Sequence, residues 1–189
     1  MNEHMSEGMK KQKNSILTIA FYVDMRENGL HTYVINAKGK KLINYLDGYG
    51  YALRSAYRGL SEGGIPIGAA LIVNNEVIAT GYNKRVQMGS SIRHGETDCI
   101  ENAGRLSAKT YSKSVLYTTL SPCFMCAGTI LLYKIPTVVI GENETFQESE
   151  SLLKEHGVNL ILLNDNETKT MFQQWCHENP ELWNEDIGV

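Results

Sequence analysis

Apolar residues between positions 51 and 60 recur every three or four residues, which is the spacing of one buried face of a helix. Gly63-Gly64 ends this pattern. Two apolar runs follow, over residues 67–73 and 77–82, and the segment Asn74-Asn75-Glu76 separates them. Because asparagine tolerates the positive φ of a tight turn, the pattern predicts a helix followed by a β-hairpin.

Helical and strand-like patterns alternate through the rest of the chain. The predicted helices cover residues 94–106 and 123–134, and the predicted strands cover residues 115–120, 137–141 and 160–163. A hairpin followed by alternating helices and strands is typical of an α/β fold in which helices lie on the faces of a mixed sheet.

Residues 1–47 have a different pattern and carry no obvious catalytic chemistry. They contain a short apolar run over residues 16–23 and the strand-like segment Tyr33-Val34-Ile35. Two short strands, a disordered tail and a misassigned start are all compatible with this pattern, because an isolated hairpin of this length is only marginally stable. We expect residues 1–47 to form an N-terminal extension of unknown role and residues 48–189 to form one catalytic domain.

The charge balance favours a small substrate over nucleic acid. Lys and Arg total 18 against 21 Asp and Glu, so the formal net charge is -3 and no global positive field attracts a polyanion. The apolar run over residues 16–23 is too short to span a bilayer, and Glu3 and Glu7 are not typical of a mitochondrial transit peptide. We expect no membrane partner and a cytoplasmic location, with the nucleus as a second compartment.

Two short segments carry the predicted chemistry, His94-Gly95-Glu96 and Pro122-Cys123-Phe124-Met125-Cys126. One imidazole nitrogen and two thiolate sulfurs suit tetrahedral Zn²⁺, and three protein ligands leave one position for water, as in catalytic zinc sites. We therefore expect His94, Cys123 and Cys126 to hold one catalytic zinc ion.

The start of a helix suits the two cysteines. Cys123 and Cys126 are three residues apart, so they face the same side of a helix whose unpaired N–H groups stabilise thiolates. Pro122 suits the first helical turn, and Ser121 is the expected cap.

Glu96 is the predicted catalytic acid and base. It lies two residues after His94, at the start of the other predicted helix, where a carboxylate can face the metal without binding it. A metal ion makes water acidic, and a neighbouring carboxylate can take the proton and deliver it to the substrate.

Two other readings of the cysteine pair stay open. A C-x-x-C pair is also typical of a redox dithiol, although such sites need no His-x-Glu helix upstream. A structural zinc site needs a fourth ligand, but Cys99 falls off the helical face of His94, and Cys176 and His177 are distant in sequence.

The pattern H-x-E…P-C-x-x-C is the signature of zinc deaminases that act on cytosine or adenine rings. From about Tyr51 to its C-terminus the chain resembles the fungal cytosine deaminases. The resemblance extends beyond the zinc motifs to these segments: Gly63-Gly64-Ile65-Pro66-Ile67-Gly68, Glu101-Asn102-Ala103-Gly104-Arg105, Leu116-Tyr117-Thr118-Thr119-Leu120, Gly141-Glu142-Asn143 and Trp183-Asn184-Glu185-Asp186-Ile187-Gly188.

The resemblance implies a cytidine deaminase-like three-layer α/β/α sandwich with a central mixed five-stranded sheet, a homodimer, and one zinc ion per subunit. It also implies a set of residues around the substrate: Asn83 and the Gly95 N–H on the pyrimidine edge, Asp186 on the exocyclic amine, the Ser121 backbone, and Phe146, Trp183 and Ile187 as closing walls. Without the resemblance, Asn83 is equally a strand cap, Phe146 a core residue and Asp186 a solvated tail charge.

The expected reaction is hydrolysis of free cytosine to uracil and ammonia, a step of pyrimidine salvage, because a pocket closed by the C-terminal segment excludes a ribose. A deaminase of a nucleoside, nucleotide or tRNA base is the first alternative, and a non-catalytic zinc-stabilised module is the second. Val86 departs from the bulkier apolar residue found in some relatives, so we expect a looser pocket wall there.

Overall fold

The computed structural model describes residues 20–26, 29–35 and 45–189, and the chain divides into two compact units, residues 1–44 and residues 45–189. In the first unit, strands β1 (Ala20–Arg26) and β2 (Gly29–Ile35) pair antiparallel, which agrees with the two-strand interpretation of this segment. The second unit begins with α1 (Tyr45–Ser61). Residues 45–47, which were expected in the extension, therefore belong to this helix.

The second unit contains a five-stranded mixed sheet, as predicted. In spatial order its strands are β4 (Glu76–Tyr82), β3 (Gly68–Val73), β5 (Ser114–Leu120), β6 (Thr137–Glu142) and β7 (Asn159–Leu162). Strand β3 is antiparallel to both β4 and β5, whereas β5, β6 and β7 are parallel. Asn74 and Asn75 form the predicted hairpin turn, with φ values of 52° and 70°.

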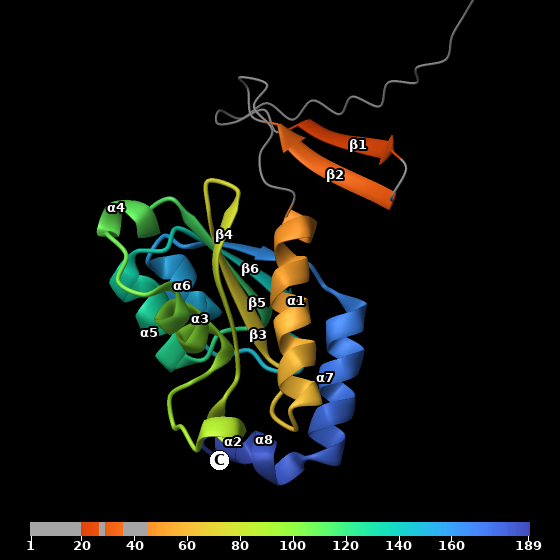
Figure 1. The fold of residues 1–189 in the computed structure, drawn as a ribbon, viewed down its shortest axis with the longest axis vertical. Coiled ribbons are helices and arrows are strands. Elements are labelled where there is room, and N and C mark those ends of the chain that lie inside the picture. The colour runs from red at the N-terminus through yellow and green to blue at the C-terminus, as the bar shows by residue number, and fades with distance from the viewer. Residues whose placement is uncertain (1–19, 27–28, 36–44) are drawn as a thin grey trace, which may run out of the picture. The chain divides into compact units, whose positions relative to one another are not determined.

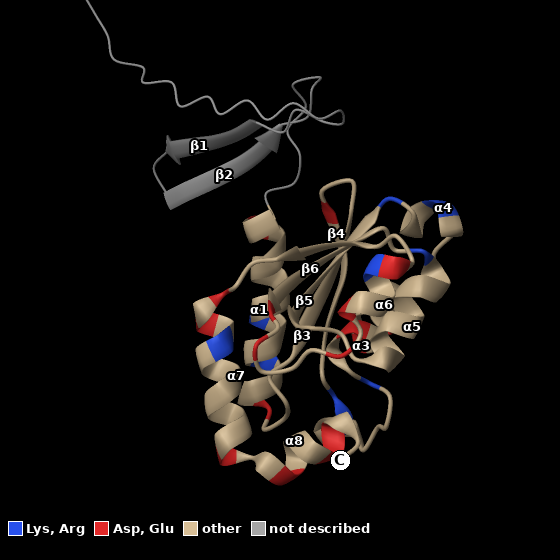
Figure 2. Ribbon diagram, turned by 180° about the vertical axis from the view of Figure 1, so that it is seen from behind, with Lys and Arg blue, Asp and Glu red and all other residues tan. Residues whose placement is uncertain are grey.

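Helices cover both faces of this sheet (Figure 1), and Figure 2 shows the same layers from behind. Helices α1 and α7 (Asn166–Glu178) lie on one face. Helices α3 (Gly95–Ala103), α5 (Phe124–Tyr133) and α6 (Glu150–Glu155) lie on the other. The short helices α2 (Arg85–Met88) and α4 (Ala108–Tyr111) and the C-terminal helix α8 (Pro180–Ile187) complete the unit. The predicted three-layer α/β/α sandwich is confirmed.

Glycines allow helices on both faces to lie directly on the sheet. A Cβ at Gly68 would overlap the backbone of α1 at Ala52 and Ala56, and a Cβ at Gly81 would overlap the backbone of α3 at Cys99. Close backbone contact therefore fixes α3, and with it the residues at its N-terminus.

The core beneath α3 and α5 is apolar. Leu71, Leu116, Ile130 and Val138 are completely buried in one cluster between these helices and the sheet. Burial of side chains of this size is typically worth about 1.5–3 kcal/mol each, so this layer helps to hold α3 and α5 in place.

Some predicted details are wrong. Helix α3 ends at Ala103 rather than at residue 106, because Gly104 turns the chain with a φ of 69°. The N-cap of α5 is Cys123 rather than Ser121, whose hydroxyl instead donates a hydrogen bond to Glu150. Helices α6, α7 and α8 were not predicted. None of the helices in the described part of the chain is long and apolar enough to cross a membrane.

Candidate metal centre and pocket

The N-termini of α3 and α5 meet at one point. His94 and Cys123 occupy the two N-cap positions in extended conformation, with ψ values of 168° and 172°. The Cys123 Sγ lies 3.5 Å from the His94 Nδ1. Possible ligand atoms of His94, Cys123 and Cys126 all lie within 4.8 Å of one another, and no other such group occurs in the part of the chain that the structure describes.

The two cysteines differ in the acidity of their thiols. A hydrogen bond from Cys126 and contact with His94 lower the pKa of Cys123 to about 4. The same hydrogen bond and complete burial raise the pKa of the Cys126 thiol well above its ordinary value. Without a metal ion the pair thus holds one thiolate and one proton, and a divalent cation would displace that proton.

Glu96 lies beside the cysteine pair and is almost fully buried. Burial raises the pKa of its carboxyl group. The Thr118 hydroxyl lies 3.1 Å from its Oε1, and the Cys126 Sγ lies 3.4 Å from its Oε2. Both carboxylate oxygens are therefore held in place from the sheet and from α5.

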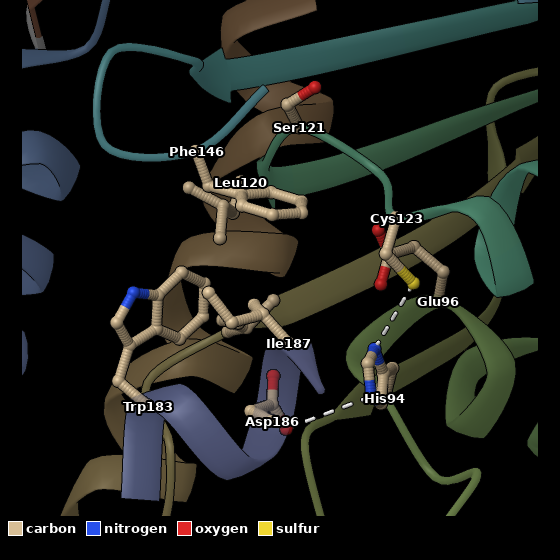
Figure 3. Close-up of a pocket in the computed structure, with 10 residues that line it drawn as sticks. His94, Glu96, Leu120, Ser121, Cys123, Phe146, Trp183, Asp186 and Ile187 are labelled. Atoms are coloured by element: carbon tan, nitrogen blue, oxygen red, sulfur yellow. Dashed lines mark hydrogen bonds and ion pairs between the residues drawn. The ribbon is translucent and has the colours of Figure 1, made fainter. Parts of the chain in front are cut away.

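A small pocket, partly open to solvent, lies above these residues. Figure 3 shows His94, Glu96 and Cys123 on one side and residues of α8 on the other. The full lining consists of Ile67, His94, Glu96, Leu120, Ser121, Cys123, Phe146, Trp183, Asp186 and Ile187. Apolar side chains make up most of the lining and a few polar groups lie among them, which suits a small ligand that carries polar groups.

Helix α8 closes the pocket through polar and aromatic contacts. The Asp186 Oδ1 accepts a hydrogen bond from the Asn83 Nδ2 at 2.9 Å and lies 3.6 Å from the His94 Nε2. Trp183 packs edge-on against Phe146 and Phe172, with ring centroids 5.6 and 5.1 Å apart.

The comparisons with known proteins agree with this geometry. Residues 47–142 match the model of the cytidine and deoxycytidylate deaminase zinc-binding region. A cytosine deaminase of Candida albicans is 50% identical over 138 residues, which are 72% of this chain and 92% of the relative. The chain belongs to the cytidine and deoxycytidylate deaminase family.

More distant deaminases share the same region. A tRNA-specific adenosine deaminase of Buchnera aphidicola is 35% identical over 111 residues, which are 58% of this chain and 73% of the relative. A structure solved in work on tRNA:A34 deaminases of the transfer RNA wobble position aligns with a TM-score of 0.55 and 23% identity, covering 64% of this chain and 99% of the other. This second likeness supports the cytidine deaminase-like fold alone.

Zinc fits the deaminase site. The matched region is the zinc-binding region of the family, and one imidazole with two thiols is a donor set typical of catalytic zinc. The other cysteines lie elsewhere: the Cys99 thiol is buried under β4 and donates to the Ala79 carbonyl, and Cys176 is on α7. Neither adds a fourth ligand.

Five of the residues expected around the substrate line the deaminase pocket: Ser121, Phe146, Trp183, Asp186 and Ile187. Asn83 and Gly95 lie just outside the lining. The Asn83 side chain contacts Asp186 and accepts a hydrogen bond from the Arg85 N–H, so it reaches the pocket through Asp186. Gly95 is the first residue of α3.

Val86 does not form a pocket wall in this structure. Its side chain lies on α2, is 42% exposed and is not part of the lining. The expectation that a smaller residue here loosens the wall is therefore wrong for this chain.

Several residues that shape the deaminase site were not predicted. Thr118 contacts Glu96, and Ile67 and Leu120 line the pocket. The buried Glu142 accepts hydrogen bonds from the N–H groups of Glu144 and Thr145, and so shapes the loop that carries Phe146. The only sequence signal for Thr118 and Leu120 is their place at the end of the strand before the cysteine motif.

Proposed function

We propose that this deaminase hydrolyses free cytosine to uracil and ammonia. The observation that carries the proposal is the small pocket between the metal site and α8, where aromatic walls and a few polar groups face His94, Glu96 and Cys123. Trp183, Asp186 and Ile187 lie opposite the metal site (Figure 3), and we infer that this wall leaves room for a pyrimidine ring but not for an attached ribose. The cytosine deaminase relative that aligns over most of its own length supports the same substrate.

His94, Cys123 and Cys126 would hold the zinc ion. Zinc, when bound there, supplies a water molecule acidic enough to lose its proton near neutral pH. The pKa of Cys123 is about 4, so this thiol is already deprotonated at neutral pH. Zinc binding then needs to displace no proton from it.

Glu96 moves the protons. Its burial favours the protonated form more than in water, so the same carboxyl group can accept a proton and then return it. We assign it the transfer to the ring nitrogen next to the amine and then to the departing amine. The Thr118 hydroxyl holds its Oε1 during both transfers.

The remaining pocket residues orient the base. Among the described residues only the Oδ1 of Asp186 has hydrogen-bond partners, which leaves Oδ2 to accept a hydrogen bond from the exocyclic amine. The Gly95 N–H, at the first position of α3, has no acceptor within its helix and can donate to the ring carbonyl. Phe146 and Trp183 supply apolar walls, and the Ser121 backbone completes the edge.

Replacement of Glu96 tests this assignment. Glu96→Gln keeps the shape and removes the titratable group, so turnover of cytosine should fall by about 10⁴-fold, the upper end for general acid-base catalysis. Metal analysis should still find one zinc per chain. Zinc loss with most of the turnover preserved would contradict the assignment.

A base within tRNA is the second candidate substrate, because tRNA-specific adenosine deaminases align with 58% of this chain. The net charge of -3 argues against it. Binding of tRNA that weakens with rising salt, together with inosine formation, would favour this candidate over cytosine.

We also propose a homodimer in the cytoplasm. Four large apolar side chains, Met88, Ile92, Phe124 and Leu132, are 57%, 64%, 56% and 73% exposed, and contact with a second copy of the chain would cover such side chains. The free cysteines, two of them metal ligands, suit a reducing compartment. A single sedimenting species at the monomer mass, across micromolar concentrations, would contradict the dimer.

A further inference from the structure

Arg85 connects the short helix α2 to the C-terminal helix α8. Its Nη1 donates to the Glu185 carbonyl oxygen at 2.9 Å and to the Asp186 Oδ1 at 3.2 Å, and its Nη2 lies 3.6 Å from the Glu185 Oε1. One planar guanidinium group therefore contacts the backbone and two carboxylates of α8. The Arg85 side chain is only 17% exposed.

These contacts determine which oxygen of Asp186 is available. The Oδ1 contacts Arg85, Asn83 and the His94 Nε2. Figure 3 shows the other oxygen pointing away from His94. Because the donors hold one oxygen, the orientation of the other is fixed before any ligand enters.

The other contacts of α8 are mainly apolar. Asp186 is its only buried residue, while the partly buried Leu182 and Trp183 pack against a core cluster that contains Phe172. Trp183, Asp186 and Ile187 line the pocket, so a movement of α8 would widen it. The Arg85 contacts hold the helix that carries these three residues.

The environment of Arg85 is a poor one for stability alone. Its Nε is buried and finds no acceptor among the described residues. A buried donor without a partner weakens a fold, so an arginine kept at such a position is typical of a functional constraint.

We propose that Arg85 is a positioning residue that latches α8 over the pocket, orienting Asp186 towards the substrate amine and setting how readily the C-terminal wall opens. The proposal rests on the proposed function for the identity of the substrate. The latch itself depends only on the contacts of Arg85 with α8.

The test compares Arg85→Gln, Arg85→Lys and the control Glu185→Gln in the zinc-loaded protein. Arg85→Gln removes the charge and the fork of donors. Arg85→Lys keeps the charge, but a compact ammonium cannot bridge the Glu185 carbonyl and Asp186 as a planar group does. Glu185→Gln removes only the negative charge at the 3.6 Å contact and leaves the Arg85 bonds to the backbone and Asp186 intact.

Hydrogen exchange of α8 amides reports the latch without any need for activity. We expect exchange at least tenfold faster in Arg85→Gln, an intermediate rate in Arg85→Lys, and wild-type rates in Glu185→Gln, with α7 unchanged in all three. Unchanged α8 exchange in Arg85→Gln would overturn the latch. If Arg85→Gln does not fold, the α8 exchange rates of Arg85→Lys and Glu185→Gln are compared instead. Equal, wild-type rates in these two variants would overturn the latch.

Kinetics then test whether the latch acts through Asp186. The KM for cytosine should rise about tenfold in Arg85→Gln while kcat stays within threefold and zinc remains at one per chain. In a protein that already carries Asp186→Asn, Arg85→Gln should raise the KM for cytosine by less than a further threefold. If Arg85→Gln raises KM as much in the Asp186→Asn protein as in the wild type, Arg85 does not act through Asp186. A wild-type protein inert towards cytosine would reject the proposed function, while the exchange rates would still decide the latch.

Discussion

The metal side and the C-terminal side of the pocket differ in what holds them in place. His94, Glu96, Cys123 and Cys126 lie at the N-termini of two helices: α3, whose backbone packs directly on the sheet, and α5, whose Ala127 and Ile130 are buried in the core. The opposite wall belongs to α8, whose only buried residue is Asp186.

The two sides of the pocket have different tasks: the metal side carries the reaction, and α8 affects how ligands enter and leave. A site that moves protons needs atoms fixed to within a fraction of an ångström, and the sheet with its close-packed helices supplies that rigidity. A pocket must also exchange its ligands, and a terminal helix with a single buried residue can move without disturbing the metal site.

The sharpest test of the rigid side removes one metal ligand. Cys126→Ala should abolish stoichiometric zinc binding and lower cytosine turnover by more than ~100-fold. This loss exceeds the one typical of replacing a residue that only hydrogen-bonds to a metal ligand. Cys176→Ala is the matched control, because that cysteine lies on α7 and should leave zinc content and turnover unchanged. Zinc analysis with steady-state kinetics measures both. Wild-type zinc content in Cys126→Ala would contradict the ligand set.

Removal of α8 should separate the two sides. In a chain that ends at Asn179, we expect zinc to stay bound, because all three ligands lie outside α8, while kcat/KM for cytosine falls about 100-fold through lost positioning. Metal analysis, far-UV circular dichroism and kinetics on the same sample check this. If the truncated chain loses both zinc and folded structure, the two sides are not separable as described.

Removal of zinc with a chelator makes it possible to measure the low pKa of the Cys123 thiol. Since the pKa of Cys123 is lowered to about 4, its thiolate is fully formed above pH 5 and is lost only as pH falls through 4. Its alkylation by iodoacetamide in the zinc-free protein should therefore be nearly constant from pH 5 to 8. The pKa of Cys176 is raised to about 12, so its alkylation rate should rise about tenfold with each pH unit over the same range. Mass spectrometry of the labelled peptides measures both rates, and a tenfold rise per unit at Cys123 would contradict the assignment.

The smallest effect is expected at Val86. Because its side chain is exposed on α2 and does not line the pocket, Val86→Phe should change the KM for cytosine by less than twofold. Arg85, its neighbour on the same helix, should have a much larger effect. A Val86→Phe variant with a tenfold altered KM would show that α2 contributes to the wall directly.

The metal motifs could be predicted from sequence because each is local. Cys123 and Cys126 are three residues apart, so they face the same side of a helix, and Glu96 follows His94 at the start of the other helix. The order of strands and helices could also be predicted, since the apolar patterns of the hairpin and the parallel strands are clear.

The supporting contacts could not be predicted. Thr118 meets Glu96 across 22 positions, and Arg85 meets Asp186 across 101, so no local pattern connects either pair. The last helices had usable signals that were missed: Asp165 caps α7 by accepting the Thr168 N–H, and a proline begins α8. The Ser121 cap was wrong because the strand end places its hydroxyl against Glu150 instead.

The most direct test of the account is the ratio of kcat/KM for cytosine to that for cytidine in the zinc-loaded protein. If α8 closes the pocket around a free base, the ratio should exceed about 100, since a wall that excludes a ribose discriminates more strongly than one extra methylene would. A ratio near or below 1 would contradict the account, because α8 would then not limit the size of the substrate.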